Sequence, residues 1–200
     1  MKKTVIVMVV LSLAFVFSSC ATMSVKRVDE STITDLSGRW NDTDSQLVAE
    51  KLVDDMLNGG WLRRYLKSSG KEPRVIVGTI ANKSDEHISV VTFVKDLERA
   101  LTNSGDVRFV ASKTEREEIR EERADMQEYA SDASRKKFKK ETAADFMLKG
   151  VLTSIPDERG GTKAVYYQID AELFDLETNE KVWVGQKKIK KLIERPGFKL

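Results

Sequence analysis

Cysteine and histidine are almost absent from this chain, which has one of each among its 200 residues. A disulfide framework needs paired cysteines, and a zinc site needs a cluster of cysteine and histidine ligands, so both are excluded. Hydrolysis through a serine or cysteine nucleophile would depend on His87 as the base. His87 lies in a polar loop and has no obvious partner, so a surface histidine is the simpler interpretation. The residue types therefore give no sign of an enzyme.

An excess of charge of one sign is also missing, because 34 basic residues are matched by 32 acidic ones, for a net charge of +2. A nucleic-acid-binding domain would show a larger basic excess, so we expect no nucleic-acid partner. Lys2 and Lys3 belong to an N-terminal signal, and without them the two signs are equal. Only three prolines occur and 40% of the residues are apolar, a composition typical of a globular protein.

No apolar run is long enough to span a bilayer as a helix, which takes about 20 residues. The N-terminal run, Val5 to Phe17, has 13 residues and follows two lysines. It ends at Ser18-Ser19-Cys20, which places the only cysteine at the processing site of a signal peptide. Residues 1–19 resemble a bacterial lipoprotein signal, with Cys20 as the first mature residue. The alternative is an ordinary signal peptide with a chance cysteine.

The lipoprotein resemblance implies a covalent lipid on the Cys20 thiol, palmitate among its acyl chains, and no other cofactor. Each buried methylene group contributes about 0.8 kcal/mol, so several acyl chains hold a protein on a membrane permanently. Residue 21 is Ala and not Asp, which by lipoprotein sorting favours the outer membrane. We therefore expect a lipid-anchored protein of the outer membrane that faces the periplasm.

Three segments follow the signal peptide. Residues 20–43 show no sustained periodicity and are expected to be the lipidated N-terminus and a short tether, which reaches at most ~80 Å when extended. Residues 44–193, about 150 in number, have the size of one domain, and no linker or repeat divides them. Residues 194–200 are expected to form a C-terminal tail.

Hydrophobic periodicity predicts alternating helices and strands in this domain. Helices are expected from about Asp44 to Asn58, over 61–69, around 93–101 and over 112–129, with a further short helix around Phe138. Strands are expected at 74–80, 107–110, 146–155 and 165–173 and from Lys181 onward, with a turn from Pro156 to Gly161. The fold class is α/β: a single domain with a central sheet of about five strands flanked by helices.

The segment Lys113 to Glu128 is unusual because eleven of its sixteen residues are charged. A helix that is polar all round is typically solvated and braced by ion pairs within itself. The alternative is that it presents a charged surface to a partner. On the second interpretation, Arg116, Arg120 and Arg123 are the candidate contact residues.

Lysines gather near the C-terminus in Gln186-Lys187-Lys188-Ile189-Lys190-Lys191. Lysines on an edge strand prevent pairing with another chain, which is the structural interpretation. A basic docking strip is the functional alternative, with Trp183 and Lys187 as candidate contact residues. The basic run 135–140 is interpreted as a solvated helix face, since export excludes a nuclear or nucleic-acid role.

Two short motifs carry no site. Gly160-Gly161-Thr162-Lys163 lacks the framing strand and glycine of a phosphate-binding loop and is expected in a hairpin turn. Asn41-Asp42-Thr43-Asp44 lacks the central glycine and terminal glutamate of a calcium loop, and helix capping explains it better. We therefore expect neither a metal nor a small-molecule substrate.

Several segments together resemble the LpoB family of lipoprotein activators of penicillin-binding proteins. They are Asp35-Leu36-Ser37-Gly38-Arg39-Trp40-Asn41-Asp42-Thr43-Asp44, Asn82-Lys83-Ser84, Leu97-Glu98-Arg99-Ala100-Leu101 with Asn103-Ser104-Gly105, Phe109-Val110-Ala111, and Glu177-Thr178-Asn179-Glu180-Lys181-Val182-Trp183. The resemblance implies one α/β domain, related in shape to the N-terminal domain of TolB. It also implies a non-enzymatic outer-membrane lipoprotein that activates a bifunctional peptidoglycan synthase.

The function expected from the sequence is therefore regulation of cell-wall synthesis through binding to a penicillin-binding protein. The alternative is a structural or assembly adaptor of another envelope complex with the same fold, which the short tether favours. A hydrolase acting on the wall is the third and weakest hypothesis.

Overall fold

The computed structural model describes residues 25–29, 32–131 and 141–194. The signal peptide, Cys20, the expected helix around Phe138, the basic run 135–140 and residues 195–200 of the tail lie outside the described residues. Internal contacts divide the chain into Met1–Thr32 and Ile33–Leu200. The few described residues of the first unit have no helix or strand. The second unit, Ile33–Leu200, contains all the described helices and strands.

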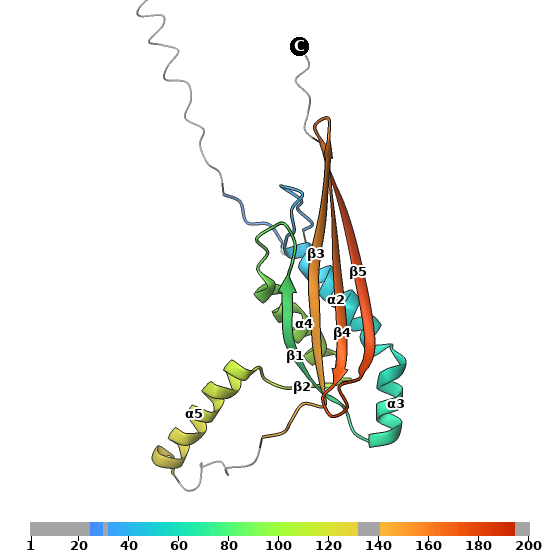
Figure 1. Ribbon diagram of the computed structural model, residues 1–200. Helices are drawn as coiled ribbons and strands as arrows, with labels where there is room; N and C mark the ends of the chain where they lie inside the picture. The colour runs from blue at the N-terminus through green and yellow to red at the C-terminus, as the bar shows by residue number, and fades with distance from the viewer. Residues whose placement is uncertain (1–24, 30–31, 132–140, 195–200) are drawn as a thin grey trace, which may run out of the picture. The chain divides into compact units, whose positions relative to one another are not determined.

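A five-stranded mixed sheet forms the centre of this unit (Figure 1). The described elements are α2 (Asp42–Leu57), α3 (Gly60–Ser69), β1 (Arg74–Asn82), α4 (Val90–Ser104), β2 (Arg108–Phe109), α5 (Lys113–Tyr129), β3 (Phe146–Arg159), β4 (Thr162–Asp175) and β5 (Lys181–Glu194). The strand order is β2-β1-β3-β4-β5. Pairing is parallel from β2 to β3 and antiparallel from β3 to β5. The predicted α/β domain with a sheet of about five strands is confirmed.

Local capping chemistry sets the start of two helices. The Asn41 side chain accepts a hydrogen bond from the backbone N–H of Asp44, whose carboxylate accepts one from the Asn41 N–H, so the two residues cap α2 reciprocally. Ser112 and Glu115 form the same pair at the start of α5, as their spacing predicts. The acidic motif at residues 41–44 is therefore a helix cap.

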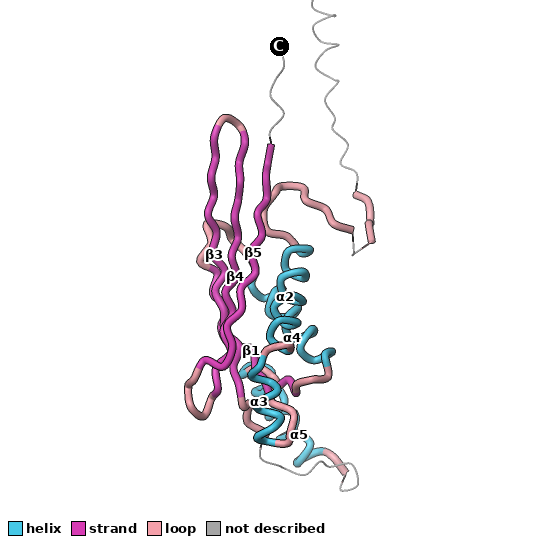
Figure 2. Tube along the Cα trace, turned by 90° about the vertical axis from the view of Figure 1, so that its right-hand side faces the viewer, coloured by secondary structure: helices cyan, strands magenta, loops and turns pink. Residues whose placement is uncertain are grey.

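The helices α2 and α4 pack on one face of the sheet, with α2 over β5 and α4 over β1 (Figure 2). The inward side chains of α2 and α4 meet the alternating residues of β4 that were predicted to be buried. These are Val165, Tyr167, Ile169, Ala171 and Leu173. The opposite face, here the outer face, carries no helix over β4 and β5 in the described part of the chain.

The β3–β4 hairpin is longer than predicted, and the expected turn from Pro156 to Gly161 is wrong. Strand β3 continues through Pro156, and the turn is only Gly160-Gly161, where both residues have positive φ. Proline lacks an N–H and is tolerated in a strand with an open edge. Because β1 pairs with β3 only as far as Leu152, the edge of β3 beyond that residue is open.

A segment ahead of α2 belongs to the folded unit. The Trp40 ring packs edge-on against the rings of Phe93 and Tyr167 at centroid distances of 6.4 and 5.6 Å. The Lys191 ammonium, almost fully buried, pairs with the carboxylates of Asp35 and Asp44 and donates to the Arg39 carbonyl at 3.0 Å. The predicted tether, 20–43, therefore overlaps a unit that begins at Ile33.

The Tyr167 hydroxyl provides a test of this packing. It is fully buried, donates to Glu86 Oε1 at 2.7 Å and accepts from the Trp40 backbone N–H at 3.1 Å. Tyr167→Phe removes both of these hydrogen bonds from a part-buried network and should lower the free energy of unfolding by about 1–3 kcal/mol, measured by urea denaturation. Tyr166→Phe, on the outer face, is the matched control and should change it by less than about 0.5 kcal/mol. Equal effects of the two substitutions would contradict the described network.

Candidate functional site

Helix α5 is held at its N-terminal end. The Lys95 ammonium on α4 donates to Glu115 Oε1 at 2.8 Å, which ties α4 to the first turn of α5. This ion pair and the hydrogen bonds from Ser112 lower the pKa of Glu115 from 4.5 to about 2. Two glutamates, Glu115 and Glu98, raise the pKa of Lys95. No described residue of α5 is buried, so polar contacts rather than a core position this helix.

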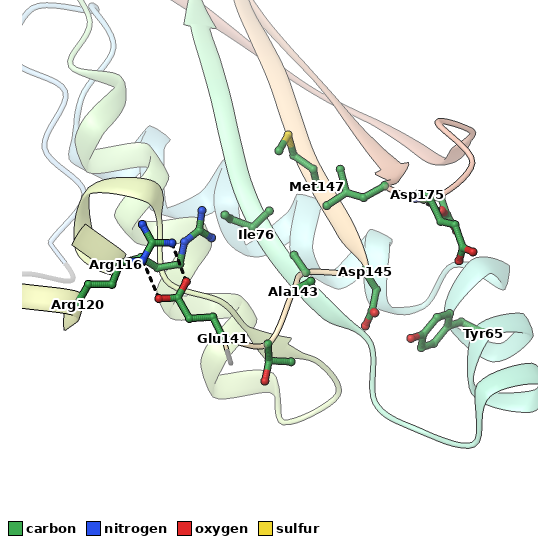
Figure 3. A pocket seen from close by; sticks show the side chains of 13 residues that line it. Tyr65, Ile76, Arg116, Arg120, Glu141, Ala143, Asp145, Met147 and Asp175 are labelled. Carbon is green, nitrogen blue, oxygen red and sulfur yellow. Dashed lines mark hydrogen bonds and ion pairs between the residues drawn. The ribbon is translucent and has the colours of Figure 1, made fainter. Parts of the chain in front are cut away.

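The three predicted arginines gather around one carboxylate, that of Glu141. Arg120 donates to it through two nitrogens, at 2.7 and 2.8 Å, and an Arg123 nitrogen lies 3.5 Å away. Arg116 donates to the Ala111 carbonyl at 3.2 Å and stands beside this pair (Figure 3). The hydrogen bond from Arg120 and the positive charges of all three arginines lower the pKa of Glu141. The cluster therefore keeps an excess of positive charge.

Sequence reasoning missed Glu141. The spacing of the arginines places them on one face of a helix, since residues four and three apart are neighbours there. Glu141 follows the basic run 135–140, and no periodicity connects it to α5. Its role depends on a contact between segments about 20 residues apart.

A cavity of about 710 Å³ lies between this arginine cluster and the lower end of β1 and β3 (Figure 3). Arg116 and Arg120 line one end of it. Asp145 and Asp175 line the other end, and Ile76, Met147 and Ala143 lie between. The cavity thus has a cationic end, an apolar floor and an anionic end.

Trp183 and Lys187 lie apart from the arginine cluster. Both are on the helix-covered side of β5, opposite Leu173 and Ile169 of β4. The indole of Trp183 covers Gly185, where an added Cβ would lie 2.2 Å from the ring. Lys187 lines a depression together with Asp44, Glu50, Lys51 and Asp54 of α2, so side chains of both charge signs surround it. The partner-binding role of these two residues and of the three arginines stays a prediction.

The other lysines of β5 are arranged on an edge strand, as the structural interpretation requires. Lys188 and Lys190 are exposed on the outer face, whereas Lys191 is buried in the ion pairs described above. Lys190 pairs in register with Tyr166, which pairs with Ile155. Ile155 and the nearby Leu192 are each 64% exposed.

These five residues, Ile155, Tyr166, Lys188, Lys190 and Leu192, are here called the distal patch. They form an apolar centre with two adjacent lysines on a part of the sheet that no described helix covers. An exposed apolar patch with a polar rim is typical of protein-binding surfaces.

The described ranges show neither a metal site nor a membrane span. No group of three His, Cys, Asp or Glu side chains in them could hold a metal ion. No helix in the same ranges is long and apolar enough to cross a bilayer. His87 is exposed in the loop before α4.

Residues 44–189 match the family model for the peptidoglycan-synthase activator LpoB. The chain belongs to the LpoB family. This confirms the resemblance inferred from the sequence segments. LpoB family members are envelope lipoproteins that act as regulatory activators and not as enzymes. A comparison with curated proteins gave no match.

Solved structures similar to this LpoB family member are distant in sequence. The LpoB C-terminal domain of Salmonella enterica is 16% identical, with 73% of this chain and 98% of that chain covered and a TM-score of 0.41. The corresponding domain of Escherichia coli is 14% identical, with coverages of 76% and 99% and a TM-score of 0.36. Lipoprotein GNA1162 of Neisseria meningitidis is 13% identical, with coverages of 63% and 88% and a TM-score of 0.38.

The Lys95–Glu115 ion pair predicts that the Glu115 carboxyl titrates at an unusually low pH. A carboxylate with a lowered pKa stabilises the fold fully above about pH 4.5, and that contribution is lost as the pH falls toward 2. By carboxyl NMR, Glu115 should titrate near 2, and Lys95→Met should raise its pKa toward 4.5. Lys113→Met, an exposed lysine at the start of the same helix, is the control and should leave the titration unchanged. A midpoint near 4.5 in the unchanged chain would mean that the ion pair is absent in solution.

Proposed function

We propose that this LpoB family member binds a penicillin-binding protein, a bifunctional peptidoglycan synthase, and raises its polymerising activity without chemistry of its own. The match of residues 44–189 to the family of peptidoglycan-synthase activators carries this proposal. The candidate surfaces described above are binding surfaces by composition, with charged and aliphatic groups but no arrangement of nucleophile and base.

The distal patch is the proposed docking surface for the synthase. Ile155 and Leu192 supply aliphatic area that is already exposed, so binding would remove it from water at about 25 cal/mol per Å². Lys188 and Lys190 beside it would orient an acidic partner surface and speed association. The extension of β3 and β4 past β1 leaves this surface accessible (Figure 1).

Anchoring through Cys20 would keep the domain close to its membrane. About 12 residues separate Cys20 from the folded unit that begins at Ile33, and an extended chain of that length spans at most ~40 Å. An outer-membrane anchor therefore requires a synthase that extends toward the outer membrane. This short connection also favours the second candidate function, an adaptor of another envelope complex.

Activation of glycan polymerisation should depend on the distal patch. Addition of the purified chain to the synthase from the same organism should raise the rate of polymerisation, and Ile155→Gln with Leu192→Gln should weaken that activation about tenfold or more, because the exposed aliphatic contact is lost. Val184→Gln is the matched control, since Val184 is 61% exposed on the same outer face near the other end of β5. It should leave activation unchanged.

Two results would decide between the candidate functions. An unchanged polymerisation rate with the native chain would reject the activator proposal. Recovery of another envelope complex without a synthase, by cross-linking of the native lipoprotein, would then support the adaptor. Activation that is lost equally in Val184→Gln would reject the distal patch but not the activator function.

Metabolic labelling and a substitution at Cys20 test the expected lipid anchor. Cells supplied with radiolabelled palmitate should label the native chain, and the chain should fractionate with the outer membrane. Cys20→Ser should abolish both the label and the membrane attachment, because the thiol that receives the lipid is gone. Ser19→Ala, one residue earlier, keeps a small residue before the cysteine and is the control that should retain both. A native chain without label would contradict the lipid anchor.

A further inference from the structure

The cavity beside α5 has an excess of positive charge at one end. Three guanidinium groups, those of Arg116, Arg120 and Arg123, surround the carboxylate of Glu141, and the Glu117 carboxylate also acts on Arg120. In the described part of the chain, the Arg116 side chain makes one hydrogen bond, to the Ala111 carbonyl, although a guanidinium carries five N–H donors. It lines the cavity, so its remaining donors are available to a second carboxylate.

The opposite end has an excess of negative charge that the backbone holds in place. Asp145 Oδ2 accepts from the Arg74 N–H at 2.7 Å, and Asp175 Oδ1 accepts from the N–H groups of Glu177 and Thr178 at 2.8 and 3.0 Å. Within the described residues, Arg74, whose guanidinium lies 3.9 Å from Asp145, is the one cation in ion-pair range of these carboxylates and of Glu177. The anionic end is thus fixed in position but not neutralised.

The dimensions suit a short extended chain. The 710 Å³ of the cavity lies within the roughly 300–1,000 Å³ common for ligand pockets. Four residues of chain connect Glu141 at one end to Asp145 at the other, so their Cα atoms are at most ~13 Å apart. The floor between the ends is apolar, formed by Ile76, Met147 and Ala143 (Figure 3). A ligand of about four residues with small side chains would span this distance.

The geometry points to a binding site for a short peptide that carries both a free carboxylate and a free amine. The carboxylate would bind Arg116 at the α5 end, and the ammonium would bind at the end lined by Asp145, Asp175 and Glu177. Free oligopeptides carry these two groups at their ends, whereas the peptide chains of peptidoglycan, amide-linked to the sugar at their N-terminus, carry the free amine on the side chain of a diamino acid. The inference does not rest on the proposed activation of a synthase, because the site lies on this chain alone.

Isothermal titration calorimetry on the full chain in detergent tests the site. Tetra-alanine with free ends should bind, and both its C-terminal amide and its N-acetyl form should bind about tenfold more weakly or worse, because each loses one charge-assisted contact. Equal affinities for the free and blocked peptides, or no binding up to about 10 mM, would overturn the proposal. A disaccharide-tetrapeptide released from peptidoglycan that binds more tightly than tetra-alanine would identify the wall as the source. Binding of tetra-alanine alone would identify free oligopeptides.

Two variants with opposite expected effects separate binding from folding. Arg116→Gln should weaken binding of the free peptide about tenfold and leave the amidated peptide unaffected, since only the carboxylate contact is removed. Glu141→Gln should tighten binding severalfold, because Glu141 competes with the ligand carboxylate for the guanidinium groups. Arg63→Gln, an exposed arginine of α3 outside the cavity, is the control and should change nothing.

The sign of the Glu141→Gln effect is decisive, because a purely structural role for Glu141 would give weaker binding. Weaker binding in that variant, with an unchanged unfolding midpoint, would overturn the site. Polymerisation assays with the same variants keep this proposal apart from the proposed function. Peptide binding without synthase activation would reject the activator alone, and activation without peptide binding would reject the cavity alone.

Discussion

The buried hydroxyl of Tyr167 holds together three segments that are far apart in the sequence. Through it, β4 is joined to Glu86 in the loop before α4 and to the backbone of Trp40 ahead of α2. A hydroxyl in such a place costs free energy unless its hydrogen bonds are made, so it permits one arrangement of these segments. Burial and the neighbouring carboxylate of Glu86 raise the pKa of Tyr167, which keeps it a donor. Trp40 and Glu86 lie just ahead of α2 and α4, so the network joins the starts of both helices to the sheet.

The features predictable from the sequence were the local and periodic ones. Alternation from Val165 to Leu173 identified the central strand, and the Ser112–Glu115 spacing identified the start of α5, because both signals lie within a few residues. Pro156 was misplaced because its tolerance depends on where a different strand, β1, ends. Burial of Lys191 could not be predicted either, since it depends on Asp35, about 156 positions away in the sequence.

In the candidate site, too, the local features could be predicted from the sequence and the long-range contacts could not. The face shared by Arg116, Arg120 and Arg123 follows from helical spacing, but their common partner Glu141 does not. The distal patch and the cavity lie toward opposite ends of β3, with Met147 at one end and Ile155 at the other. At ~3.3 Å per residue these two residues are roughly 26 Å apart, so the two surfaces are separate regions of the domain.

The ion pairs of Lys191 also determine where a pulling force on the N-terminal segment would enter the fold. Tension on the chain ahead of Asp35 would act first on the Lys191 ammonium, and then on the Trp40 ring, before reaching the first turn of α2. Lys191 lies on the edge strand β5, which is paired with β4 along almost its whole length. A load applied there is shared among many hydrogen bonds instead of peeling one helix from the domain. In a chain anchored ahead of Asp35, tension would therefore reach β5 through Lys191 before it reaches α2.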